Sequence, residues 1–155
     1  MNDKLWVSLA TVGPLGYAKK APGTVGSVPG VFVGVCLQWV SSFFASSLIV
    51  YVGLIALTIV ALLAIQVTEQ CWGSHDDSKI VIDEVVGQAI VSSFIPLEVG
   101  VQALGFVAFR VFDILKPWPV SFFDQKVPGA TGTLFDDVVA GLMGLGLILG
   151  IFYFL

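Results

Sequence analysis

The stretch from Ala21 to Thr68 contains no Lys, Arg, Asp, Glu or His. A run of this length holds two membrane spans, because a helix crosses the hydrocarbon core with about 20 apolar residues. The whole chain agrees, since 57% of its 155 residues are hydrophobic, 12% are charged and the mean hydropathy is +0.97. The apolar fraction is above, and the charged fraction below, that of ordinary soluble domains. We therefore predict an integral membrane protein in which residues 1–155 form a single domain.

Apolar segments separated by turn residues predict an all-α polytopic bundle with about four to five transmembrane or membrane-embedded helices. The third and fourth segments are short for a full crossing at about 1.5 Å per residue. They form a hairpin that either crosses tilted or thinned lipid or stops part-way. Pro96 should end the third segment, because its ring disfavours helix in the preceding residue. The five expected segments are Val28–Phe44, Leu48–Val67, Asp83–Phe94, Glu98–Phe112 and Val138–Leu155.

The charges predict which side of the membrane each loop faces. If every segment crosses, regions 1–27, 68–82 and 113–137 share one side and contain all the lysines, whereas the other side carries Glu98 and no cation. The positive-inside rule then places the three regions in the cytoplasm. No cleaved signal peptide is expected, because the first apolar stretch soon meets Lys19-Lys20.

Several other classes of site are not expected. The two cysteines, Cys36 and Cys71, lack the spacing of metal ligands and are interpreted as small packing residues rather than a disulfide. The net charge of −4 gives no reason to expect nucleic-acid binding. The sequence predicts no oligomeric state.

The first polar region, Lys19–Ser27, has two readings. Its glycines and hydroxyls precede a predicted helix, so backbone N–H groups and the lysines are able to hold a phosphate. It lacks the GxxxxGK[ST] pattern of a Walker loop. Taken alone, it is also typical of a turn that enters the membrane beside a positive anchor.

The second polar region carries Asp83-Glu84 at the start of a predicted helix. Two acids at a helix N-terminus serve either as caps that complement the helix dipole or as metal ligands. Gly87 lies on the same helix face as Asp83, which leaves room for a ligand or a neighbouring backbone. His75, the one histidine of the chain, is interpreted as an exposed loop residue.

The third polar region joins cations to a second acid pair. Arg110, Asp113 and Lys116 follow each other at i,i+3, so Asp113 should lie beside both cations. An ion-paired helix end explains these three residues. It does not explain why two acids, Asp136-Asp137, open the last predicted span, because one Asp suffices as an N-cap. Two acids facing Asp83-Glu84 suggest an oxygen-ligand site for Mg²⁺, with the cations holding a phosphate.

Four ordered motifs give the chain a resemblance to the phosphatidylglycerophosphatase A family of bacterial membrane lipid phosphatases. They span nearly the whole sequence and are Ala-Pro-Gly-Thr-x-Gly-Ser (21–27), Ile-Val-x-Asp-Glu-x-x-Gly (80–87), Phe-Arg-x-Phe-Asp-x-x-Lys-Pro-x-Pro (109–119) and Asp-Asp-x-x-Ala-Gly (136–141). The chain departs from the family at Ala130, where a glycine is common, and at Gln125, where an arginine is common. Both departures lie outside the acid set.

The resemblance implies Mg²⁺-dependent hydrolysis of phosphatidylglycerophosphate to phosphatidylglycerol and phosphate, at the cytoplasmic face of the bacterial inner membrane. The alternatives are a phosphatase for another lipid phosphate and a non-enzymatic membrane scaffold. The implied partners are this phospholipid substrate and the membrane bilayer. The expected metal ligands are Asp83, Glu84, Asp136 and Asp137; the expected phosphate ligands are Lys20, Thr24, Ser27, Arg110 and Lys116; and Asp83, Asp136, Asp113 and Arg110 are expected to take part in catalysis.

Overall fold

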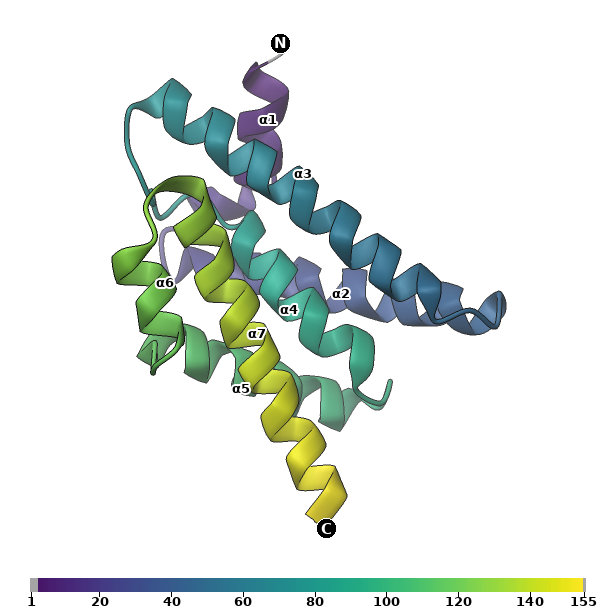
Figure 1. Ribbon diagram of the computed structural model, residues 1–155. Helices are drawn as coiled ribbons and strands as arrows, with labels where there is room; N and C mark the ends of the chain where they lie inside the picture. Colours follow the sequence, from purple (N-terminus) through teal and green to yellow (C-terminus); the bar gives the residue numbers. More distant parts are fainter. Residues whose placement is uncertain (1–2, 155) are drawn as a thin grey trace.

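The computed structural model describes residues 3–154 and is helical throughout, without a strand in that range (Figure 1). Three of its helices, α2, α3 and α7, are long and apolar enough to cross a membrane. The prediction of an all-α bundle with membrane-length helices is therefore confirmed. The elements are α1 (Asp3–Ala10), η1 (Leu15–Tyr17), α2 (Pro22–Phe43), α3 (Leu48–Trp72), α4 (Ile82–Phe94), α5 (Val99–Leu115), α6 (Val120–Lys126) and α7 (Gly129–Phe154).

Helix α4 lies inside the bundle, in contact with α2, α3, α5 and α7 (Figure 1). Of its 13 residues, all except Glu84 and Phe94 are buried. Its length of about 20 Å is less than the hydrocarbon thickness of about 30 Å. Because its neighbours shield it from lipid, α4 tolerates polar residues such as Gln88 and Ser92, which donate and accept a hydrogen bond of 2.9 Å.

A stripe of glycines on α2 allows α4 to pack closely against it. Gly26, Gly30 and Gly34 recur every four residues and so lie on one face of α2. A Cβ at any of them would lie within 2.6 Å of an atom of α4 or of its N-cap residue. Small residues at this spacing let the backbones of membrane helices approach each other. The contact fixes the position of α4 along α2.

Two glutamines from neighbouring helices cap the C-terminal end of α4, directly before the Ile95-Pro96 pair. Gln38 on α2 donates from Nε2 to the carbonyl oxygens of Ser93, at 3.2 Å, and Ile95, at 2.8 Å. Gln102 on α5 donates to the carbonyl oxygen of Pro96 at 3.1 Å. The last carbonyls of a helix have no partner within the helix itself. The side-chain amides supply these partners, and the helix ends where the proline predicts.

Two helices begin earlier than the sequence analysis expects. Helix α2 starts at Pro22 instead of Val28, since proline at the first helical position loses no hydrogen bond. Helix α7 starts at Gly129 instead of Val138, so residues 129–137, expected to precede the last segment, are helical. A Cβ at Gly132 would overlap the carbonyl of the residue Val127, which shows that this glycine permits close packing rather than a turn.

The early start of α7 changes the position of its acid pair. Asp136 and Asp137 lie two turns inside α7, so the prediction that they open the last helix is wrong. The expected third and fourth segments agree with α4 and α5 to within a few residues. The short helices α1 and α6 were not expected, because 8 and 7 residues are too few to give a clear periodic pattern.

Candidate active site

Three carboxylates from two helices meet at one end of the bundle. Asp83 and Glu84 lie in the first turn of α4, and Asp137 comes from α7; their ligand oxygens lie within 4.8 Å of one another. Asp83 is 5% exposed and Asp137 is 4% exposed. The two helices come close because Gly87 and Gly141 face each other, and a Cβ on either would collide with the opposite backbone.

The acid cluster brings three carboxylates together in a largely buried site. Among the described residues, no hydrogen bond reaches Glu84 Oε2 or Asp137 Oδ1, although both atoms are buried. Buried carboxylates are normally paired or bound to a metal. This set of oxygen donors therefore fits a hard divalent cation such as Mg²⁺.

Asp136, the fourth predicted metal ligand, lies beside this cluster and faces a lysine. Its Oδ2 accepts a hydrogen bond of 2.7 Å from Lys116 Nζ, and its Oδ1 accepts one of 2.9 Å from the Asp137 N–H. Lys116 also pairs with Asp124 on α6. Burial lowers the pKa of Lys116, but its hydrogen bonds to Asp124 and Asp136 outweigh this effect and raise the pKa above its usual value. Asp136 therefore holds the positively charged Lys116 side chain at the edge of the acid cluster.

Arg110 connects α5 to the start of α2. It pairs with Asp113 one turn later, as predicted, and its Nη1 donates to Ser27 Oγ at 3.3 Å. A Cβ at Gly23 would overlap the Glu84 carboxylate and lie 3.2 Å from both terminal nitrogens of Arg110, so the guanidinium lies next to the acid cluster. The expected contact of Asp113 with Lys116 is wrong, because the chain turns at Lys116 and directs this side chain to Asp136.

Lys20 and Thr24, the remaining predicted phosphate ligands, lie near the cluster in sequence but are not bound to it. Lys20 is exposed in the segment before α2, and Thr24 is half-buried in the first turn of α2. Within residues 3–154, no hydrogen bond or ion pair joins either side chain to the acids. Both remain predictions as substrate ligands.

Sequence reasoning missed Glu69, a buried acid in the last turn of α3 that is 6% exposed. One of its oxygens accepts hydrogen bonds from the Asp76 N–H at 3.2 Å and from Thr133 Oγ1 at 3.5 Å. The other lies 3.3 Å from His75 Nδ1. The available signal was its place as the first acid after the uncharged run. Glu69 ties the loop after α3 to the start of α7.

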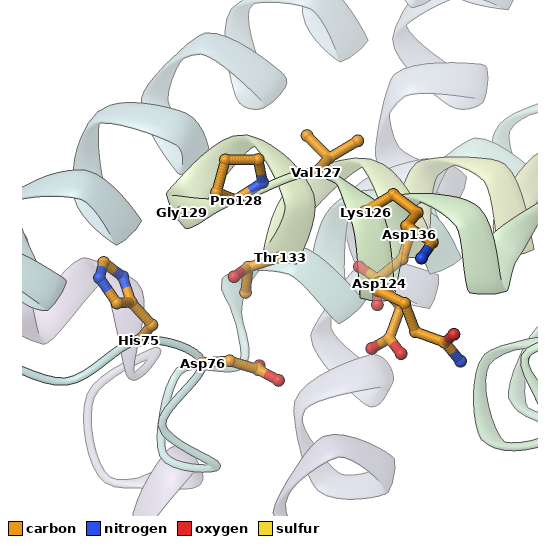
Figure 2. Close-up of a pocket in the computed structure, with 10 residues that line it drawn as sticks. His75, Asp76, Asp124, Lys126, Val127, Pro128, Gly129, Thr133 and Asp136 are labelled. Atoms are coloured by element: carbon orange, nitrogen blue, oxygen red, sulfur yellow. The ribbon is translucent and has the colours of Figure 1, made fainter.

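A cavity of about 480 Å³ opens between this loop and the turn from α6 to α7 (Figure 2). His75 and Asp76 line it on one side, and Asp124 and Asp136 on the other. Because Asp136 is adjacent to Asp137, the cavity and the acid cluster lie next to each other.

Comparison with known proteins identifies the family. The profile of the family described as phosphatidylglycerophosphatase A matches residues 8–152. The chain belongs to this family. It is 33% identical over 147 residues to a phosphatidylglycerophosphatase A of Escherichia coli, covering 92% of this chain and 81% of the relative. It is 38% identical over 144 residues to one of Haemophilus influenzae, covering 90% and 84%.

A third relative carries another name. A putative phosphatidylinositol-3-phosphatase of Bacteroides thetaiotaomicron is 31% identical over 136 residues, which cover 86% of this chain and 84% of that protein. No solved structure matches the chain. Membership of the family confirms the resemblance drawn from the four motifs, and with it the predicted hydrolysis of phosphatidylglycerophosphate in phospholipid synthesis.

Proposed function

We propose that this protein hydrolyses phosphatidylglycerophosphate with Mg²⁺ held by Asp83, Glu84 and Asp137. The observation that carries the proposal is the set of three clustered carboxylates, two of which have buried oxygens without a hydrogen-bond partner among the described residues. Asp136, bound to Lys116, completes the predicted acid set directly or through water. When bound there, Mg²⁺ would neutralise charge on the phosphate oxygens and orient the phosphate.

The cations next to the cluster bind the terminal phosphate. Asp113 and Ser27 orient Arg110, which donates its remaining N–H groups to phosphate oxygens. Lys116, held by Asp136, supplies a second positive charge. Lys20 and Thr24 add donors when the headgroup is bound. Phosphoryl transfer depends mainly on positioning and charge stabilisation, so these groups suffice for the reaction.

In the overall reaction, an oxygen from water becomes bonded to phosphorus and the bond from phosphorus to the glycerol oxygen breaks. The glycerol oxygen takes up a proton and leaves as the hydroxyl of phosphatidylglycerol. Inorganic phosphate is the second product. A site at the end of a membrane bundle suits this substrate, because its acyl chains stay in the bilayer while its headgroup reaches the acids. We place this end at the cytoplasmic face of the bacterial inner membrane by the positive-inside rule.

The test is phosphate release from phosphatidylglycerophosphate by purified protein in detergent micelles. Chelation of divalent cations should abolish release, and added Mg²⁺ should restore it. Asp83→Asn and Asp137→Asn should each lower kcat by at least 100-fold, whereas Asp136→Asn should act mainly through Lys116 and raise KM as well. Asp77→Asn, in a loop where this acid pairs only with Lys79 among described residues, is the matched control. Near-normal turnover by the Asp83 or Asp137 variant would refute the metal site.

A second substrate class is favoured by one observation, the relative named as a putative phosphatidylinositol-3-phosphatase. We therefore include a phosphatidylinositol phosphate in the same assay. A higher kcat/KM for this lipid than for phosphatidylglycerophosphate would assign the chain to that substrate while leaving the acid cluster unchanged.

A further inference from the structure

The cavity beside the acid cluster is lined by many hydrogen-bonding side chains. Three of them are the carboxylates of Asp76, Asp124 and Asp136, Thr133 contributes a hydroxyl, and His75, Gln125 and Lys126 also line the cavity. Carboxylates accept hydrogen bonds from hydroxyl groups, and amide and ammonium groups donate hydrogen bonds to them. In Figure 2, Asp76 and Thr133 lie between His75 and the two acids of the opposite wall. The lining therefore favours a neutral group that carries hydroxyls.

The walls of this cavity are fixed by a buried side chain behind them. Glu69 accepts the hydrogen bonds of the Asp76 N–H and of Thr133 Oγ1, and so joins the loop to α7. Asp76 adopts φ +51, a left-handed conformation that the contact to Glu69 holds in place. Glu69 thus holds the loop after α3 in a fixed position relative to helix α7. This is the rigid support that a selective binding site requires.

The cavity also lies beside the acid cluster, because the two share neighbouring residues of α7. Asp136 lines the cavity, and its Oδ1 accepts the N–H of Asp137, which belongs to the cluster. A phosphate at the cluster and the first atoms attached to it would therefore span the boundary between the two sites. With about 480 Å³, the cavity holds a small polyol together with water.

We propose that this cavity binds the hydroxyl-bearing glycerol of the lipid headgroup, and that Asp76 and Thr133 determine specificity for it. The inference rests on the proposed function, because it takes the acid cluster to bind the terminal phosphate. The cavity would explain why the enzyme prefers a lipid phosphate whose headgroup contains glycerol. A lipid whose phosphate is attached directly to diacylglycerol places no free hydroxyl in the cavity and gains nothing from these two residues.

The experiment compares two lipids that share a terminal phosphate monoester. Phosphatidylglycerophosphate has the glycerol, and phosphatidic acid with the same acyl chains lacks it. Asp76→Asn removes the charge and keeps a residue that tolerates positive φ, and Thr133→Val removes the hydroxyl while keeping the shape. Each variant should raise KM for phosphatidylglycerophosphate about fivefold, the effect of one hydrogen bond. Both should leave kcat/KM for phosphatidic acid within twofold. Ser78→Ala, on the exposed part of the same loop, is the control.

The alternative results are distinct. Equal losses on both lipids would mean that the two residues only support the fold, and unchanged kinetics would mean that the cavity does not contact the headgroup; either result overturns the proposal. A second measurement does not need turnover. Wild-type protein in micelles should bind phosphatidylglycerol more tightly than phosphatidylmethanol, and Asp76→Asn should remove the difference. Selective binding without phosphate release would reject the proposed function and retain the cavity, whereas release without selectivity would reject the cavity alone.

Discussion

Replacement of Gly87 by alanine should separate the two halves of the acid cluster. The new Cβ would lie 2.5 Å from the carbonyl oxygen of Asp137 and 2.5 Å from the ring of Phe109. Ordinary contacts begin at about 3.4 Å, so the neighbours must move by about 1 Å. Phe109 is fully buried and the Asp137 carbonyl belongs to a helix, so neither yields easily. We expect the first turn of α4, with Asp83 and Glu84, to shift away from α7.

The effect on activity should exceed the effect on stability. Overpacking costs about 1–3 kcal/mol, and the better helix propensity of alanine offsets about 1 kcal/mol of this. The free energy of unfolding should therefore fall by no more than about 2 kcal/mol. A displacement of about 1 Å at a catalytic group lowers activity by about 100-fold. The Mg²⁺ concentration for half-maximal activity should rise at the same time.

The assay is phosphate release as a function of Mg²⁺ concentration, together with thermal unfolding of the same preparation in detergent. Gly146→Ala is the matched control, because Gly146 is also a helical glycine of the bundle and a Cβ there meets no atom within 4 Å. Activity of Gly87→Ala within threefold of wild type, at an unchanged Mg²⁺ requirement, would refute the reasoning that this contact sets the geometry of the cluster.

Three further predictions concern other parts of the bundle. Gln102→Leu removes amide donors from the end of α4 and should lower the free energy of unfolding by about 1 kcal/mol, measured by thermal unfolding in detergent, with normal activity at low temperature. Arg110→Lys keeps the charge but loses the planar donors, so KM for phosphatidylglycerophosphate should rise about tenfold; an unchanged KM would exclude Arg110 from phosphate binding. In cells expressing a variant without native cysteines, an impermeant thiol reagent should label Glu98→Cys and leave Ser78→Cys unmodified until the membrane is opened; the reverse pattern would invert the orientation.

The number and type of the main helices were predictable, because a bilayer permits few solutions for a chain with long uncharged runs. The acids of the cluster were also predictable. Asp83, Glu84 and Asp137 stood out as charges that are costly to keep beside apolar spans. Their convergence was expected from the predicted alternation of segments, which should bring the start of α4, the end of α5 and the start of α7 to one side of the bundle.

The different surroundings of Asp136, which bonds Lys116, and Asp137, which joins the acid cluster, were not predictable. They depend on the rotation of α7, and this is set by its packing through Gly141 against Gly87. The partners of Lys116 were also not predictable, because they too depend on how the helices pack. Asp124 lies on α6, whose seven residues give no periodic signal, and the turn after α5 directs the lysine to that helix. Glu69 was hidden because its three partners come from segments distant in sequence or from loop backbone.

The burial of α4 separates Asp83 and Glu84 from the outer surface of the bundle. The helix that carries Asp83 and Glu84 touches other helices along most of its length, through the glycines of α2 on one side and the capping glutamines at its far end. Large apolar side chains are exposed instead on α3 and on the end of α7, two of the helices that are long enough to cross a membrane. A bilayer that becomes thicker, thinner or more ordered therefore acts on the outer helices first. The outer residues are free to change with the membrane of the host, while the helix that carries Asp83 and Glu84 keeps its surroundings.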